Sequence, residues 1–117
     1  MDEEEYFGVI DETEIERRLA KLNVPFAAEY FPDSKNYPYV VYLTPSATYY
    51  GADGVNLKRD QRFRVELYTA TKKDKLRKKL FELFNDVPFE VEEISGGQKN
   101  YYVTVIEFEQ TLDLEYD

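Results

Sequence analysis

The side chains best suited to chemistry in this sequence are carboxylates, because its 117 residues include no histidine and no cysteine. Glu107 and Glu109 lie in a stretch that alternates like a β-strand, so they share one face, ~7 Å apart along the strand. Carboxylates at that separation suit the hydrolysis of a glycosidic bond. Both are expected on the outer face of a tyrosine-rich strand, however, and nothing in the sequence marks a cleft, so we expect no catalysis there.

Two further stretches resemble ligand sites only in part. Asp53 and Asp60 flank a glycine and an asparagine, but the spaced oxygen ligands and closing glutamate of a calcium-binding EF-hand are missing, so Asp53-Gly54 reads as a tight turn. The run SGGQKN at 95–100 lacks the Lys-Ser/Thr ending of a phosphate-binding loop and falls between two predicted strands. The sequence predicts no catalytic residue, no metal site and no cofactor.

The charge of the chain is uneven as well as acidic. The net charge is −9, which argues against sequence-specific or general binding to nucleic acid. Residues 1–34 carry 10 acidic and 3 basic side chains, residues 35–85 carry 5 and 11, and residues 86–117 carry 9 and 1. A basic middle between acidic ends can be neutralised within one fold, or it can pair with the ends of neighbouring copies.

Eleven tyrosines and eight phenylalanines are more than a core of this size requires. Tyrosine is enriched at protein interfaces, because it buries a large area and keeps a hydroxyl group for a hydrogen bond at the rim. Tyrosines also half-cover the open face of a sheet. Both interpretations stay open from the sequence.

Two amphipathic helices are predicted to position these groups. In the first, Thr13 and Glu16 form a capping box, and the apolar residues repeat at helical spacing until Asn23 and Pro25 end the helix. The second lies within 69–88 and is coated with lysines. Its apolar stripe consists of Leu76, Leu80, Leu83, Phe84 and Val87.

Five strands are predicted, at 25–31, 39–45, 61–69, 89–95 and 101–110. The order is helix, three strands, helix, two strands. We therefore expect a single α+β domain over 1–117, a two-layer sandwich of a mostly antiparallel sheet with both helices packed on one face. Short acidic tails are expected at both ends, and a long loop or arm at about 46–60. An acidic start predicts no secretory signal, and no apolar run is long enough to span a membrane.

Several runs resemble one family of small phage proteins. They are PYVVYLTP, YYGADGVNLKRDQRFRVELYTATKKDKLRKKLFELF, FEVEEI and YYVTVIEFE, within roughly residues 10–110. The similar elements are a proline–aromatic strand, Ala52-Asp53 in the long loop, Glu66 to Thr69 at a strand end, Lys73-Asp74 at a helix start, and a last strand ending near Glu107-Phe108. This pattern is similar to that of the tail terminator, or tail completion, proteins of long-tailed phages and prophages, which are also called head–tail joining or minor structural proteins.

The resemblance implies an α+β fold and a structural role without catalysis. It implies a homo-oligomeric ring, often a hexamer, that caps the tail tube and meets the head-completion or connector protein. The expected location is the tail or neck of the virion, and the host cytoplasm during assembly. A head-closure or other neck protein of the same assembly is an alternative.

We interpret the long loop as an arm that contacts a neighbouring subunit. Tyr49 and Tyr50 are expected to anchor it, with Gly51 and Gly54 as bends and Asp53 in the turn. Its basic side chains are expected to meet carboxylates of the neighbour. These are Lys58, Arg59, Arg62 and Arg64.

Two functions of other classes stay open. The chain could be an acidic inhibitor that mimics DNA, since both ends and FEVEEI are rich in carboxylates, although the basic helix argues against it. It could also be a small enzyme, which the lack of histidine and cysteine disfavours. The run KKDKLRKKL is expected to pack against acidic protein and not against lipid or nucleic acid.

Overall fold

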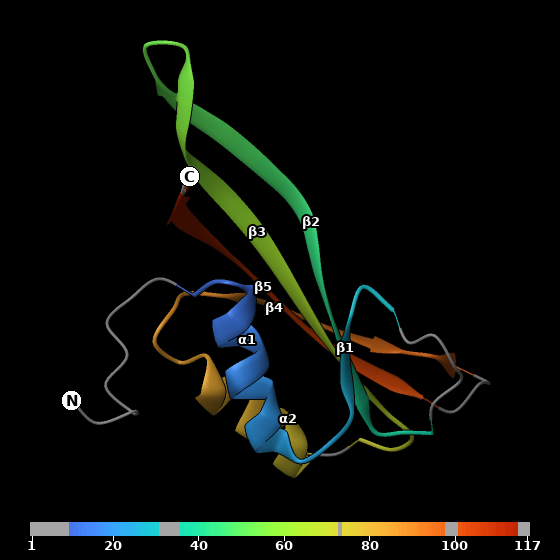
Figure 1. The fold of residues 1–117 in the computed structure, drawn as a ribbon. Helices are drawn as coiled ribbons and strands as arrows, with labels where there is room; N and C mark the ends of the chain where they lie inside the picture. Colours follow the sequence, from blue (N-terminus) through green and yellow to red (C-terminus); the bar gives the residue numbers. More distant parts are fainter. Residues whose placement is uncertain (1–9, 31–35, 73, 98–100, 115–117) are drawn as a thin grey trace.

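The computed structural model describes residues 10–30, 36–72, 74–97 and 101–114. One five-stranded sheet is covered on one face by two helices, and a long hairpin extends beyond them (Figure 1). The elements are α1 (Glu12–Leu19), the 3-10 helix η1 (Ala20–Leu22), β1 (Phe26–Ala28), β2 (Tyr39–Ala52), β3 (Val55–Thr69), α2 (Asp74–Leu83), β4 (Glu90–Ser95) and β5 (Tyr102–Asp113). The α+β class, the two-layer arrangement and the element order match the sequence prediction.

The strand order is β1-β2-β3-β5-β4. Only the β1–β2 pair is parallel, and the other three pairs are antiparallel. The predicted alternation of the third strand is confirmed, since Phe63, Val65 and Leu67 are buried while the residues between them are only partly covered. The core lies between this face of the sheet and the helices, where Phe84, the residue after α2, packs on Phe108 of β5.

The N-cap of the first helix lies two residues earlier than the sequence predicts. The Asp11 side chain accepts a hydrogen bond of 2.9 Å from the Glu14 backbone N–H, so Asp11, and not Thr13, is the N-cap. Asp and Thr are both good N-cap residues, and the sequence offers both within one turn. The apolar stripe is as predicted, with Ile15, Leu19 and Leu22 buried.

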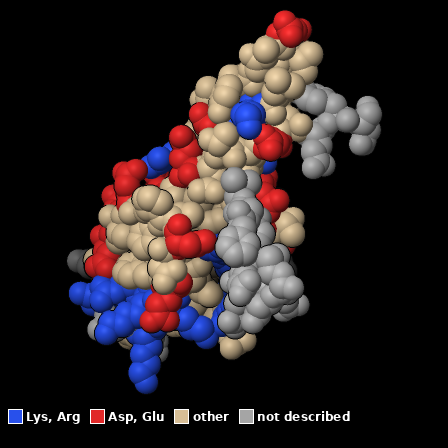
Figure 2. Space-filling model, turned by 90° about the vertical axis from the view of Figure 1, so that its left-hand side faces the viewer, with Lys and Arg blue, Asp and Glu red and all other residues tan. Residues whose placement is uncertain are grey.

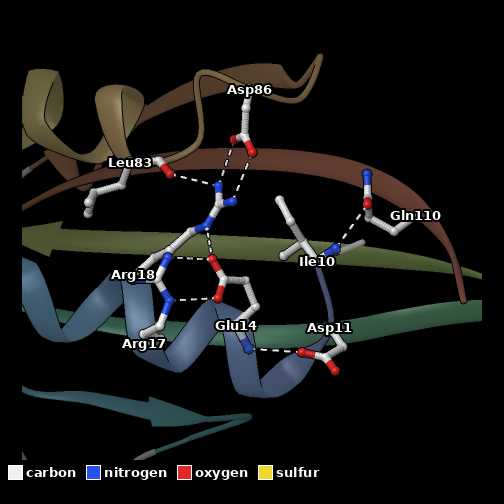
Figure 3. A network of polar contacts seen from close by, with 8 residues as sticks. All are labelled: Ile10, Asp11, Glu14, Arg17, Arg18, Leu83, Asp86 and Gln110. Atoms are coloured by element: carbon white, nitrogen blue, oxygen red, sulfur yellow. Dashed lines mark hydrogen bonds and ion pairs between the residues drawn. The ribbon is translucent and has the colours of Figure 1, made fainter. Parts of the chain in front are cut away.

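A buried ion network joins the two helices (Figure 3). Arg18 donates to Glu14 within α1, to both carboxylate oxygens of Asp86, and to the Leu83 carbonyl at the end of α2. The hydrogen bonds from Arg17 and Arg18 hold the pKa of Glu14 below its usual value, and Arg18 does the same for Asp86. Since Arg18 and Glu14 are almost fully buried, this network fixes how α1 sits against α2.

Tyrosines cover part of the open face of the sheet. Tyr37, Tyr39, Tyr68 and Tyr101 stack on one another, with ring centroids 4.8–6.4 Å apart. Val41, Val103 and Val105 face the same side of the sheet and are buried. For these four tyrosines, the interpretation as sheet-covering side chains is confirmed.

The expected loop at 46–60 is wrong, because the segment is β-hairpin along its whole length. β2 and β3 continue to a two-residue turn at Asp53-Gly54. The two glycines suggested a loop, but a Cβ on Gly51 would lie 1.9 Å from the Val55 carbonyl oxygen. Gly51 therefore marks a close approach of two backbones within a strand pair. We keep the name arm for residues 46–60.

Candidate assembly interface: the hairpin arm

The arm is a two-stranded extension of the sheet. In the turn, Asp53 and Gly54 have φ angles of 56° and 76°, the left-handed pair that a tight Asp-Gly hairpin requires. β5 accompanies β3 only as far as the pair Lys58–Asp113, so the tip projects without a third strand (Figure 1). The predicted tight turn at Asp53 is confirmed, and the calcium-loop interpretation has no geometric support.

A bulge at its base sets the direction of the arm. The β2–β3 register shifts between Leu43 and Ser46, around Pro45, which has no N–H to give to the ladder. Gln61 is buried beneath this shift, and its side-chain amide donates to the Ser46 and Arg62 carbonyls at 2.8 and 3.0 Å. Gln61 thus satisfies backbone groups at the bulge and fixes where the arm leaves the sheet.

The tip of the arm exposes large apolar side chains. Tyr49 and Tyr50 are 53% and 42% exposed and point to opposite faces of the hairpin, and Tyr50 is 3.3 Å from Asp60 through its hydroxyl group. Val55 and Leu57 are 47% and 48% exposed. Sequence reasoning missed these last two, although the apolar–polar–apolar run after Gly54 is the signal of a strand and would have revealed them.

The two basic residues of the arm have partners within the chain. Lys58 Nζ lies 2.8 Å from an Asp113 carboxylate oxygen, and this contact raises the lysine pKa. Arg59 donates to Gln61 at 2.6 Å and reaches Glu12 of α1 at 3.2 Å. Both side chains thus have a carboxylate partner within the chain, and a contact of either with a neighbour's carboxylates stays a prediction.

An ion-pair ladder occupies the open face of the sheet at the base of the arm. Arg62 bridges Glu107 and Glu90 at 2.8 and 2.9 Å, and Arg64 bridges Glu107 and Glu66 at 2.9 and 2.6 Å. Hydrogen bonds from Arg64 and then Arg62 lower the pKa of Glu107. Arg62 and Arg64 thus also have carboxylate partners within the chain, and their contact with a neighbour stays a prediction.

The ion pairs of Glu107 also bear on the hydrolysis of a glycosidic bond that was considered for Glu107 and Glu109. A general acid needs a raised pKa, whereas the pKa of Glu107 is lowered by two guanidinium groups. Glu109 is exposed, next to this ladder on the same strand. Within the described part of the chain, no three Asp or Glu side chains converge in a way that would hold a metal ion.

The structure thus divides the seven predicted interface residues into two groups. Tyr49, Tyr50 and Asp53 lie together at the exposed tip. Lys58, Arg59, Arg62 and Arg64 lie below them, each in an ion pair. The arrangement can present an apolar, weakly acidic tip to another protein.

Among the described residues, no helix has the length and apolar character needed to cross a membrane. No family model matches the chain, and no curated protein matches it either.

Proposed function

We propose that this protein is a structural component of a long-tailed phage or prophage, and that its copies join through the arm into a ring that caps the tail tube and meets the head connector. The main structural support for this proposal is the arm. It extends past the helices and exposes four large apolar side chains, none of which belongs to the core. The resemblance to tail terminator proteins supplies the biological setting.

The shape of the molecule supports a head-to-tail contact. The described chain extends 54 × 33 × 26 Å, and its long dimension ends in the arm (Figure 1). A cyclic ring uses two unlike surfaces of each subunit, so a projecting element on one side suits it well. Exposed tyrosines suit the anchoring role, because they bury much area at low entropic cost.

The ion pairs weaken the alternative of a DNA-mimicking inhibitor. Such a protein presents unpaired carboxylates on one surface, in place of phosphates. Here the carboxylates of Glu14, Glu66, Glu93 and Glu107 are neutralised by arginines of the same chain.

The proposal is tested by assembly of the purified protein and of a variant with a shortened arm. Thr48 pairs directly with Asp60, so replacing residues 49–59 by Asn-Gly keeps the remaining backbone pairing of β2 with β3 and restores a two-residue turn. We expect rings of the wild type in negative-stain microscopy, alone or on tail tubes, and a folded monomer for the shortened variant. Exchange of the exposed Tyr30, away from the arm, for serine is the matched control and should leave the rings intact.

Two results would overturn this function. One is a wild type that stays monomeric at high concentration and also with tail tubes present. The other is a shortened variant that assembles and joins tails as the wild type does.

A further inference from the structure

The unpaired positive charge of the described chain gathers at the end opposite the arm. All six arginines form ion pairs with carboxylates of the chain. A group of lysines around α2 and the adjoining η1 makes no ion pair with any described residue: Lys21, Lys72, Lys75, Lys78 and Lys79. Figure 2 shows this basic surface at the lower end of the molecule, with the arm at the upper end.

A small cavity lies beside the start of α2, at the same end. It has a volume of about 210 Å³, and its lining combines apolar and aromatic residues such as Leu67 and Tyr102 with the charged Lys72, Arg77 and Glu93. Ligand pockets for small molecules usually measure roughly 300–1,000 Å³. A cavity of this size and lining suits one inserted side chain better than a cofactor.

The outer face of the arm carries the opposite charge. The strand register places Asp60, Glu109 and Asp113 on the same face as Tyr50, and Asp53 lies at the tip. Lys58 is the one basic residue of this group, so four carboxylates and one ammonium group leave a net charge of −3. Arg62 faces the same side but is already bound to Glu90 and Glu107.

We propose that the arm of one copy docks on the α2 end of the next, with Tyr50 inserted into the cavity beside Lys72 and the arm carboxylates facing the lysines of α2. The partner is thus a second copy of this chain, and the inference rests on the proposed ring. The two surfaces are opposite in charge and lie at opposite ends of the molecule, so they meet only between copies.

Exposed charge pairs contribute mainly to the rate and the orientation of association, and salt screens them. Burial of the Tyr50 ring against the apolar part of the cavity, such as Leu67, would provide the part of the affinity that resists salt. We therefore expect the concentration at which half the protein is assembled to rise roughly tenfold between 50 and 500 mM NaCl, without complete loss of assembly.

The absence of cysteine from the chain allows a direct test by cross-linking. A variant that combines Tyr50→Cys with Ser95→Cys should form a series of covalent oligomers up to the full ring on oxidation. Ser95 is exposed, lines the cavity and lies on the same face of the sheet as Tyr102, Glu93 and Leu67. A variant with Tyr30→Cys and Ser95→Cys is the matched control, because Tyr30 is 70% exposed but lies outside the arm. It should give no such series.

Charge reversal provides a second, independent test. Lys75→Glu with Lys78→Glu, and separately Asp60→Lys with Glu109→Lys, should each raise the half-assembly concentration at least as much as high salt does. An equimolar mixture of the two variants should assemble in alternation, because each basic surface then finds an acidic one. Glu29→Lys with Glu92→Lys is the control. It changes the net charge by the same amount as Asp60→Lys with Glu109→Lys, but at exposed positions off the arm, and this variant should assemble like the wild type.

The outcomes separate this inference from the proposed function. Rings that form without Tyr50–Ser95 cross-links and that tolerate the reversed charges would overturn the docking mode and leave the ring intact. No assembly of the wild type, with or without tail tubes, would overturn both.

Discussion

The guanidinium group of Arg18 donates to both carboxylate oxygens of Asp86, at 2.7 and 2.8 Å, across 68 positions of the sequence. The same group binds Glu14, which is almost fully buried (Figure 3). Two carboxylates and a helix-end carbonyl therefore share one cation at the junction of α1 and α2. Such a contact orients the two helices and depends wholly on its central residue.

Arg18→Met should destabilise the fold by about 3 kcal/mol, because it replaces the apolar stem of the side chain but leaves Glu14 and Asp86 without their shared cation. Urea unfolding followed by circular dichroism measures the loss. Arg17→Met is the control: Arg17 is 39% exposed and should cost no more than ~1 kcal/mol. Equal losses for the two variants would show that Arg18 has no special role.

Stability should fall on acidification below about pH 4.5, the usual range of carboxyl titration. The pKa values of Glu14, Asp86 and Glu107 are lowered in the folded state, so unfolding releases these groups to bind protons more readily. The stability that these three carboxylates contribute is complete above their pKa in the unfolded chain. It is lost as the pH falls through their lower pKa values in the folded protein. Glu107→Gln should flatten this acid slope, measured as the free energy of unfolding against pH.

Glu109→Gln is the matched control for that experiment, since Glu109 is on the same strand but exposed. It should leave the acid slope unchanged. An identical slope for the wild type and Glu107→Gln would contradict a stabilising role for the ion pairs of Glu107 with Arg62 and Arg64.

The fold could be predicted from the sequence because its main elements carry strong periodic patterns. The Phe63, Val65 and Leu67 alternation and the helical stripe through Leu80 and Phe84 each identify a buried face. The arm was misread because Gly51 and Asp53-Gly54 are signals of loops as well as of tight hairpins. Only the facing strand reveals that Gly51 sits against the Val55 carbonyl.

The pairing of charges was harder to predict than the fold. The excess of basic residues in the middle of the chain is visible in the sequence, but not which of them are neutralised. For the arginines of β3 the strand register decides this, because it sets Arg62 and Arg64 beside Glu107. Lys75, Lys78 and Lys79 of α2 have no carboxylate partner among the described residues. Pairing across 43–45 positions has no local signal in the sequence.

Gly51→Ala should open the tip of the arm while sparing the core. Its Cβ would meet the Val55 carbonyl oxygen at 1.9 Å and the Leu57 backbone nitrogen at 2.7 Å, so the strands must separate there. We expect faster amide hydrogen exchange at 50–58 and a nearly unchanged melting temperature. Gly54→Asn is the control, because no atom lies within 4 Å of its Cβ and asparagine tolerates a positive φ. Slow exchange at the tip of the Gly51→Ala variant would contradict the close approach.

Tyr49→Ser with Tyr50→Ser should separate assembly from stability. Both side chains are exposed and absent from the core, so their removal should change the free energy of unfolding by no more than ~0.5 kcal/mol. Phe63→Ala is the opposite case, because Phe63 is fully buried against Phe108 and its loss should cost about 3–5 kcal/mol. Urea unfolding gives the stabilities and sedimentation velocity gives the assembly. If the tyrosines serve a partner surface, the double variant stays as stable as the wild type yet fails to assemble, whereas a large drop in its stability would show that they belong to the fold.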